Sequence, residues 1–488
     1  MVSSIMSQIA FAILLAFVSV TFAQQTNFVD KESKIGHFFE PQWFRDNIPF
    51  VEVPIKEIEE VYYYRWSSHK RHLRYTIPGN GYVVTEFINN IGYSLKYDTI
   101  NAAAGHHIRE SRWLRDRRYA QDYINFWTRG GGDSHSYSEW IAEAAYNSFL
   151  VDGDEDFIKS QLEGLVRNYK RWDDHYNADW KLYWISPERD AQELSCSSFQ
   201  SDDPFWGGEG YRPSFNSEMY ENAVAISKIA ALVGDFNMFL EFQQKAEDLK
   251  AAIMQRLWDP VRKFFYHGFR DNNTNYELVD SREEVGFYPW EYNIPGNSSE
   301  FAEAWEQLID SEGFGTLYGP TTCEVRSQYF DGNQTDQCCW WNGNSWPYST
   351  SHTLKALANQ VRNYKNSPVV GVNEFVKTLQ TYALTQYKND KPYVAECHSP
   401  IQKIWVGDRH NLSEHYAHST YVENVLADLL GVIPRSDNIF EINPLVPNNW
   451  RFFAAENIPY HGHSVTVLYD ADGSYYESGH SGMQIFVN

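Results

Sequence analysis

The stretch NSEMYENAVAISKIAALVGDFNMFLEFQQKAEDLKAAIMQRL, residues 216–257, decides the fold. Apolar side chains recur at helical spacing in both of its halves, at Met219, Ala223, Ile226, Ala230 and Val233 and then at Phe242, Ala246, Leu249, Ile253 and Leu257. Gly234 ends the first predicted helix, Asp235 caps the second, and Asp259-Pro260 stops it. The pattern therefore predicts two antiparallel helices joined by a tight turn.

The same arrangement is expected on both sides of this pair. One predicted helix runs from about Ser136 to Val151 and ends at Gly153-Asp154, and a second continues to about Trp172. Further helices are predicted at Tyr119–Thr128, Ser299–Leu308, Ser349–Asn363, Asn373–Lys388 and Tyr421–Leu430. Each pair must bury its apolar face against neighbouring pairs. The sequence therefore predicts a mainly α fold in which helix pairs close into an (α/α) toroid.

The two ends of the chain differ from this helical middle. Ile439-Phe-Glu-Ile-Asn and Ser464-Val-Thr-Val-Leu-Tyr alternate with the period of a strand and predict a small C-terminal β module on the toroid. Residues 24–71 have a mixed pattern, and we expect an extended arm that crosses the mouth of a pocket. The expected organisation is a signal peptide at 1–23, a helical barrel at 24–432 and the β module at 433–488.

The first residues have the character of a secretory signal. Met1–Ala23 has no charged residue, and its apolar run Ile9–Val20 ends in Thr-Phe-Ala before Gln24, which indicates cleavage after Ala23. The run is too short to span a bilayer, and no other segment approaches about 18 apolar residues. We therefore expect a secreted protein; retention of the segment as an anchor is the alternative. Four sequons agree with export and with N-glycosylation in a eukaryote, at Asn272, Asn297, Asn333 and Asn411.

Charge and cysteine content limit the partners. A net charge of −23 argues against nucleic acid and anionic membrane as partners, and fits a neutral substrate in an acidic medium. No Cys/His spacing resembles a zinc site, so we expect no metal and no cofactor, and we expect a monomer. Five cysteines leave at least one thiol outside any intramolecular pair. The favoured disulfide joins Cys323 to Cys338 or Cys339, because this pairing closes a short loop that carries a sequon.

The chain contains an unusual tryptophan-rich segment, Cys339-Trp-Trp-Asn-Gly-Asn-Ser-Trp-Pro-Tyr348. Each indole N–H and amide in it needs a partner when buried, which a packed core supplies poorly. A sugar pocket uses such groups well, because pyranose faces stack on indole rings and amides bind hydroxyls. The segment therefore indicates a carbohydrate site; an aromatic turn between two helices is the alternative.

Three motifs give the chain a family resemblance. Trp340-Trp-Asn-Gly-Asn-Ser-Trp-Pro347 resembles a Trp-x-Gly-Pro-x-Trp loop, with Asn344 in place of the usual proline. Arg189-Asp-Ala-Gln-Glu-Leu-Ser195 resembles the trehalase-type Glu-Ser-Gly-Trp-Asp-Phe-Ser pattern, and Ala395-Glu-Cys-His-Ser-Pro400 resembles a Glu-Asn-Tyr-Asn-Pro loop. With these motifs, the chain resembles the six-hairpin glycosidases, the superfamily of trehalase, processing α-glucosidase and mannosylglycerate hydrolase. The resemblance implies an (α/α)6 toroid over nearly all of the mature chain.

The resemblance also implies a catalytic pair. It places Glu193 at the position of the general acid, where Glu replaces the family's Asp, and Glu396 at that of the general base. Arg189, Ala191 and Gln192 also depart from the family's pattern, and Asp190 competes with Glu193 for the role of acid. Two carboxyl groups about 6.5–9.5 Å apart, one protonated and one ionised, perform inverting glycoside hydrolysis. Glu283, Glu284 and Glu291 are further carboxylates expected along the funnel, and weaker candidates for the base.

Aromatic and basic residues in other segments are expected to contact the sugar. The predicted substrate-binding group is Arg65, Trp66, His106, Arg109, Arg212, Trp341, Asn342 and Trp346. The alternative for each member is a buried, hydrogen-bonded structural role, and His415 is equally compatible with a place in the core.

The function predicted from these residues is a secreted inverting glycoside hydrolase acting on a neutral oligo- or polysaccharide. Three alternatives stay open: a polysaccharide lyase on a similar toroid, an epimerase using His106 and His107, and a carbohydrate-binding protein without turnover. Lyase products absorb ultraviolet light, whereas hydrolase products do not. A binding protein binds glycans without converting them.

Overall fold

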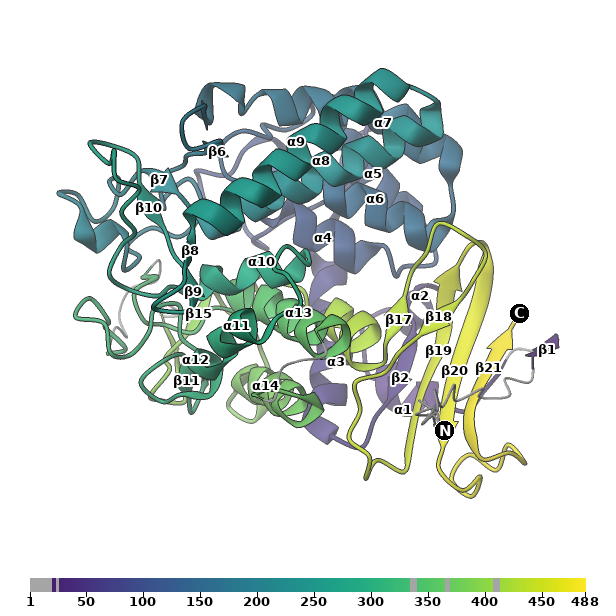
Figure 1. Cartoon of the computed structure of the whole chain (residues 1–488). Helices are drawn as coiled ribbons and strands as arrows, with labels where there is room; N and C mark the ends of the chain where they lie inside the picture. Colours follow the sequence, from purple (N-terminus) through teal and green to yellow (C-terminus); the bar gives the residue numbers. More distant parts are fainter. Residues whose placement is uncertain (1–19, 23–25, 334–339, 365–368, 407–412) are drawn as a thin grey trace, which may run out of the picture.

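The computed structural model describes residues 20–22, 26–333, 340–364, 369–406 and 413–488. Helices arranged around a common centre form most of it, and a sheet lies against one side of them (Figure 1). None of the helices in these ranges is long and apolar enough to cross a membrane.

An inner ring of helical segments surrounds the centre. In the described part of the chain it consists of α4 (Ala104–Ser111), α6 (Ile141–Asp152), α8 (Pro213–Val233), α10 (Tyr288–Glu291), α13 (Pro347–Asn363) and the π-helical segment η8 (Asn424–Leu429). Each segment packs against the next in this order. The ring closes because Glu110 of α4 accepts the backbone N–H groups of Tyr421 and Glu423, at 2.8 and 3.1 Å. The predicted (α/α)6 toroid is therefore confirmed.

An outer layer covers this ring. It consists of α5 (Arg118–Thr128), α7 (Glu155–Lys170), α9 (Phe236–Arg256), α11 (Ser299–Ala302), α12 (Glu306–Ile309), α14 (Val372–Thr385) and α3 (Lys56–His72). Helices α7 and α9 pack against α8, and α14 packs against both α13 and α3. Two short helices, α1 (Lys31–Ile35) and α2 (Pro41–Asn47), precede α3.

The helix pair that opened the sequence analysis forms as expected. Gly234 ends α8 with a φ of 84°, a left-handed conformation that glycine adopts without strain. The carboxylate of Asp235 then accepts the N–H of Met238 and caps α9 at 3.0 Å. Gly153 and Asp154 repeat the device between α6 and α7. Both predicted αα-hairpins are thus confirmed, with α6 beginning five residues later than expected.

The helix predicted at 421–430 forms, with π-helical geometry over Asn424–Leu429. Two other expectations about local structure are wrong. Residues 299–308 form two short α-helices joined by a 3₁₀ turn, where one helix was expected. The expected arm at 24–71 contains the 17-residue helix α3. Its periodicity escapes detection because its inward face includes Arg65, Ser68 and His69 as well as apolar residues.

The β module is a five-stranded sheet in the order β1-β21-β20-β19-β2. Its C-terminal strands are β19 (Phe452–Tyr460), β20 (His463–Asp470) and β21 (Gly482–Val487), which form an antiparallel meander. Strand β2 (Phe50–Glu52) joins from the N-terminal arm, and β1 (Val20–Phe22) pairs in parallel with β21. Strand β1 lies inside the predicted signal peptide, so cleavage after Ala23 would remove it from the sheet.

Short two-stranded sheets complete the fold. They pair β3 (Leu73–Tyr75) with β4 (Tyr82–Val84), β5 (Tyr176–Asn177) with β6 (Leu182–Tyr183), β7 (Gly210–Tyr211) with β10 (Gly268–Phe269), β8 (Trp258–Asp259) with β9 (Phe264–Phe265), β11 (Gly315–Thr316) with β12 (Gly319–Pro320), β13 (Tyr387–Lys388) with β14 (Lys391–Pro392), β15 (Cys397–His398) with β16 (Trp405–Val406) and β17 (Val432–Ile433) with β18 (Glu441–Ile442). Several of them, including β7, β10 and β15, lie at the end of the toroid opposite the five-stranded sheet (Figure 1).

Candidate active site

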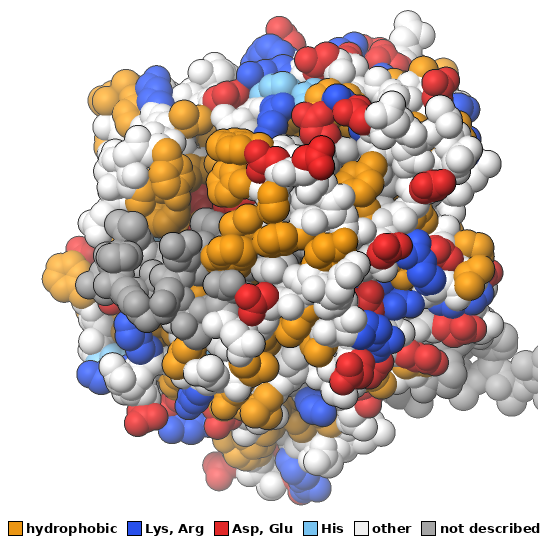
Figure 2. Space-filling model, turned by 90° about the vertical axis from the view of Figure 1, so that its left-hand side faces the viewer, with side chains coloured by type: hydrophobic (Ala, Val, Ile, Leu, Met, Phe, Trp, Pro, Cys, Tyr) orange, Lys and Arg blue, Asp and Glu red, His pale blue; other side chains and the backbone are white. Residues whose placement is uncertain are grey.

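The loop-bearing end of the toroid presents hydrophobic and acidic side chains together. Figure 2 views the molecule from this side and shows hydrophobic side chains gathered near the middle of the face, with acidic side chains among them. Glu193 and Glu396 belong to loops next to η4 (Ser198–Gln200) and β15 respectively, and β15 lies at this end of the toroid (Figure 1). Both are half-buried.

A third carboxyl group, that of Glu86, lies with these two. Burial raises the pKa of Glu86 to about 8, and the charges of Glu396 and Glu193 contribute to the rise. Its Oε1 accepts a hydrogen bond from the Tyr416 hydroxyl, and its buried Oε2 has no partner among the described residues. Three carboxyl groups from distant parts of the chain therefore share one electrostatic environment, in which Glu86 is neutral at neutral pH.

The loop that carries Glu193 has a constrained backbone. Ala191 and Leu194, on either side of Gln192-Glu193, have φ values of 55° and 56°. Left-handed conformations cost free energy in residues other than glycine and persist only where the surroundings hold them. Asp190 helps to keep this backbone in place. It is 1% exposed and accepts hydrogen bonds from Arg212 Nε (2.6 Å) and Ser214 Oγ (2.5 Å).

Arg212 binds the same loop through its guanidinium group. Its guanidinium is fully buried and also donates to Gln192 Oε1 at 2.7 Å and to Glu283 Oε2 at 3.3 Å. Asp190 and Arg212 thus form a buried ion pair within and next to the Glu193 loop, while Glu193 itself is more exposed. A buried pair of this kind fixes geometry, because loss of either partner leaves an uncompensated charge.

A disulfide bond also anchors the loop that carries Glu193. Cys196, three residues after Glu193, is bonded to Cys323. The predicted pairing of Cys323 with Cys338 or Cys339 is therefore wrong, and both of those cysteines lie outside the described residues. Closeness in sequence favoured the short loop, but the fold brings Cys323 to Cys196 over a separation of 127 residues.

Glu396 is held through its neighbours in sequence. Two residues before it, the Val394 N–H donates to the Tyr64 hydroxyl at 2.9 Å. Two residues after it, His398 forms a backbone bridge with Ser345 of the tryptophan-rich segment. The position of Glu396 is therefore set by α3 on one side and by the tryptophan-rich segment on the other.

The tryptophan-rich segment is compact. The rings of Trp341 and Trp346 stack at 3.8 Å with an interplanar angle of 13°, and Trp346 Nε1 donates to the Trp340 carbonyl at 3.1 Å. Asn342 Nδ2 donates to the Tyr329 carbonyl at 2.9 Å. Both side-chain polar atoms of Asn344 are buried without a partner among the described residues. Such atoms are rare in native proteins and mark places where a ligand or water belongs.

Histidines with unpartnered nitrogens lie beside this segment. The His106 ring is 4.5 Å from that of Tyr348 and 4.7 Å from that of His352, and the His418 ring is 5.6 Å from Tyr348. Both ring nitrogens of His106 and of His418 are buried without partners among the described residues. Burial lowers the pKa of both histidines well below its usual value, so both are neutral. The centre of the toroid is thus rich in neutral hydrogen-bonding groups.

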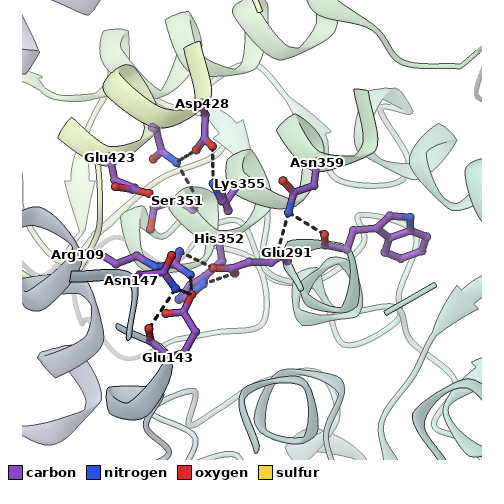
Figure 3. Close-up of polar contacts among 12 residues, drawn as sticks. Arg109, Glu143, Asn147, Glu291, Ser351, His352, Lys355, Asn359, Glu423 and Asp428 are labelled. Carbon is purple, nitrogen blue, oxygen red and sulfur yellow. Dashed lines mark hydrogen bonds and ion pairs between the residues drawn. The ribbon is translucent and has the colours of Figure 1, made fainter. Parts of the chain in front are cut away.

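Arg109 lies in a separate ionic network (Figure 3). It donates to Glu143 and, at 2.8 Å, to Glu291, whose second oxygen is 2.6 Å from His352 Nδ1. Burial alone would raise the pKa of Glu291, but His352 and Arg109 lower it by charge and hydrogen bonding. Glu291 is consequently an enclosed carboxylate. Glu284 is also buried, where it accepts from Thr353 at 2.9 Å and has a pKa raised to about 8.

The remaining predicted contacts, Arg65 and Trp66, both lie on α3. Arg65 donates to the Ser419 carbonyl at 2.6 Å and to Gln386 Oε1 at 3.1 Å. It therefore supports the segment that carries Tyr416 and His418. Trp66 is fully buried in the main hydrophobic core.

Sequence reasoning missed Glu86 and Tyr416. A signal for Glu86 exists in Tyr82-Val-Val-Thr-Glu-Phe87, where a single acid interrupts a run of strand-forming residues. Such an acid is costly to bury and is often functional. Tyr416 carries no comparable signal, because its partner comes from residue 86.

One cluster has the residue types of a metal site. His135, Asp174 and His175 place ligand atoms within 4.8 Å of one another. However, Arg189 Nη1 lies 3.1 Å from His175 Nε2, and the same guanidinium binds the His135 carbonyl. His175 Nδ1–H donates to the Trp184 carbonyl at 2.8 Å, so its Nε2 accepts from Arg189. A guanidinium already occupies the position that a cation would take.

Comparison with known proteins identifies the family. Residues 96–419 match the family model described as the mannosylglycerate hydrolase MGH1-like glycoside hydrolase domain. The chain belongs to this family. The match covers both Glu193 and Glu396 and leaves out α3 and the five-stranded sheet. The expected resemblance to six-hairpin glycosidases is thereby confirmed.

The chain is also similar to individual proteins. A solved structure titled sialidase is 35% identical with a TM-score of 0.85, and the match covers 92% of this chain and 40% of that one. The mannosylglycerate hydrolase from Thermus thermophilus, solved with glucose, shares the fold at 12% identity and a TM-score of 0.56, over 75% of this chain and all of that one. An uncharacterized protein of Borreliella burgdorferi is 25% identical over 270 residues, 54% of this chain and 51% of its own. The chain thus spans about half or less of the sialidase-titled and Borreliella proteins.

Proposed function

We propose that the chain hydrolyses glycosidic bonds in a neutral oligo- or polysaccharide with inversion at the anomeric carbon. Glu193 is the general acid and Glu396 the general base. The observation that carries the proposal is the joint electrostatic influence of Glu193 and Glu396 on buried Glu86, in a chain of a glycoside hydrolase family. This influence supports a single site that contains the two motif-derived carboxyl groups.

Each carboxyl group has a defined task. Glu193 gives its proton to the oxygen of the leaving sugar, while Glu396 removes a proton from the water that attacks the opposite face of the anomeric carbon. The acid must hold its proton near neutral pH, and a nearby carboxylate favours this. Glu86 stays neutral through burial, so it adds no further negative charge. Asp190 is paired with Arg212 and is therefore poorly suited to donate a proton.

The surroundings favour a neutral substrate. His106 and His418 are neutral, and the two arginines Arg109 and Arg212 are already paired with acids. A uronic acid, the substrate of a polysaccharide lyase, would need a cation that is not already engaged. The stacked Trp341 and Trp346 supply apolar ring faces of the type that pyranoses contact.

We also propose that the protein is secreted, N-glycosylated in a eukaryotic host and active as a monomer. The asparagines of three sequons, Asn272, Asn297 and Asn333, are exposed, and Asn411 lies outside the described residues. One chain supplies Glu86, Glu193 and Glu396. Sequencing of the mature N-terminus and glycosidase digestion test secretion and glycosylation, and light scattering tests the monomer.

The test of the hydrolase compares wild type, Glu193→Gln, Glu396→Gln and Glu188→Gln on α- and β-linked neutral glycans. Glu188 is a matched control, because it is half-buried in the same loop. We expect new reducing ends of inverted anomer from wild type and Glu188→Gln, and a loss of roughly 10²–10⁴-fold in the other two. Products that absorb ultraviolet light, or glycan binding without turnover, would favour the lyase or the binding protein.

A further inference from the structure

A large pocket lies on the far side of α3 from the centre of the toroid. It has a volume of about 1140 Å³, at or above the usual range of small-molecule sites, about 300–1,000 Å³. Its floor is one face of α3, where Tyr63, Tyr64, Ser67, Lys70 and Arg71 recur at helical spacing. The opposite face of α3 is buried in the toroid.

One wall of the pocket is aromatic. Phe39, in the turn before α2, is 84% exposed, and Trp43 of α2 lies beside it on the pocket wall. The Lys70 ammonium is 5.4–5.6 Å from the ring centres of Phe39, Trp43 and Phe44, which holds these rings in place. An exposed phenylalanine in a concave site offers a flat apolar surface for stacking.

The pocket is lined by four acids and four Lys or Arg residues, and four of these eight groups are paired within it. Lys34 binds Glu59, and Lys70 binds Glu40. Among the described residues, Ser67 and Arg71 on the floor have no hydrogen-bond or ion-pair partner. The site therefore combines an aromatic surface, unused hydrogen-bonding groups and little net charge. These properties together match a neutral saccharide, whose hydroxyls need donors and whose C–H faces need rings.

Through Tyr64, the pocket also contacts the loop that carries Glu396 and the segment that carries Tyr416. The hydroxyl of Tyr64 accepts the Val394 N–H at 2.9 Å and lies 2.7 Å from His415 Nδ1. Val394 is two residues from Glu396, and His415 precedes Tyr416, the partner of Glu86. An occupant that contacts Tyr64 therefore contacts a side chain that holds the Glu396 loop and the segment that carries Tyr416.

We propose that this pocket is a second saccharide-binding site, separate from the cleavage site and coupled to it through Tyr64. The choice of a neutral saccharide as occupant rests on the proposed function. Bound sugar stacks on Phe39, receives hydrogen bonds from Ser67 and Arg71, and keeps Tyr64 in the position that supports Glu396.

The test titrates the full chain carrying Glu193→Gln with cellohexaose, maltohexaose, mannohexaose and xylohexaose by calorimetry. We expect two sites per chain for at least one probe, and roughly tenfold weaker binding at one of them after Phe39→Ala, which corresponds to about 1.4 kcal/mol. Phe236→Ala is the matched control, because Phe236 is 71% exposed at the start of α9 and outside the pocket. Ser67→Phe, which fills the floor, should abolish the same site.

The outcomes separate this proposal from the proposed function. At most one site per chain with all four probes, or two sites that Phe39→Ala and Ser67→Phe leave unchanged, would overturn the second site. Hydrolysis of the probes is followed in parallel with the wild-type chain. Two-site binding without any hydrolysis would overturn the proposed function and leave the second site standing.

Discussion

Ser345 and His398 exchange two backbone hydrogen bonds, 2.9 Å from the Ser345 N–H and 2.8 Å from the His398 N–H. Ser345 immediately precedes Trp346 of the stacked tryptophan pair, and His398 follows Glu396 by two residues. The aromatic surface proposed to bind the sugar and the carboxylate proposed to activate water are therefore joined by the main chain. We expect a displacement of one to be transmitted to the other.

Substitution of Trp341 should show this connection. Trp341→Ala removes the ring on which Trp346 stacks, so we expect a higher KM and also a kcat lowered by about tenfold, because Glu396 shifts with the segment. The cost in unfolding free energy is about 3–5 kcal/mol. Trp341→Phe keeps a stacked ring and should recover most of kcat. A rise in KM with kcat unchanged would show that the two loops move independently.

Asp190 and Glu193 should differ in what their loss affects. Asp190→Asn leaves Arg212 buried with a weakened partner, and we expect about 3–5 kcal/mol less stability in denaturant unfolding. Glu193→Gln should retain the wild-type midpoint and lose activity. Exposed Asp202 in the same loop gives the control Asp202→Asn. Full stability of Asp190→Asn together with lost activity would instead assign the proton donor to Asp190.

The Cys196–Cys323 disulfide should contribute to both stability and rate. The double variant Cys196→Ala/Cys323→Ala should lose about 2–5 kcal/mol of unfolding free energy. Because Cys196 lies three residues from Glu193, kcat should fall more than the stability loss explains at temperatures where the variant is folded. Circular dichroism melting and steady-state kinetics measure the two effects. Equal kcat at low temperature would limit the disulfide to a role in stability.

Glu86 should make the stability of the protein depend on pH. Its pKa is raised from 4.5 to about 8 in the folded chain, so its contribution to stability is present below about pH 4.5 and lost as pH rises to about 8. Glu86→Gln lacks this dependence. Its stability relative to wild type should therefore increase from pH 5 to pH 8, by up to roughly 4 kcal/mol, since one pKa unit is about 1.4 kcal/mol.

The neighbouring histidines should make stability depend on pH in the opposite direction. The pKa values of His106 and His418 are lowered by burial, so their contribution is lost as pH falls below about 6.5. Both histidines are present in wild type and in Glu86→Gln, so their contribution cancels in the difference in stability between the two proteins. Thermal melts of wild type, Glu86→Gln and the exposed control Glu477→Gln at four pH values measure the difference. A difference that does not vary with pH would mean that Glu86 is ionised in the folded chain.

Tyr64 should act on the rate through Glu396. Tyr64→Phe leaves the Val394 N–H and His415 Nδ1 without their partner, at a cost of about 1–3 kcal/mol. We expect a lower kcat and an altered pH profile of kcat. Tyr63→Phe is the matched control, since the Tyr63 hydroxyl likewise bridges backbone groups, at Val51 of β2, far in sequence from the catalytic loops. Identical kinetics for both variants would exclude a positioning role for Tyr64.

Local signals explain what the sequence could predict. The Gly-Asp turns at 153–154 and 234–235 combine a left-handed glycine with a capping aspartate, so the helix pairs follow from neighbouring residues. The disulfide of Cys323 with Cys196 spans 127 residues, and the hydrogen bond from Tyr416 to Glu86 spans 330 residues. No local sequence pattern encodes either contact. Arg109 and Arg212 have the residue type of a sugar contact. Only the fold shows that acids already bind both guanidinium groups.

Strand β2 has a consequence for how the protein is made. Residues 50–52 pair with residues 454–456. About 400 further residues must therefore be synthesised before this strand can pair. Contacts of such long range slow folding and leave an unpaired strand edge exposed in the meantime. The ring closure between Glu110 and the segment at 421–423 imposes the same delay. We therefore expect the ring to close only after residues 421–423 have been made, and the sheet to form only after residues 454–456.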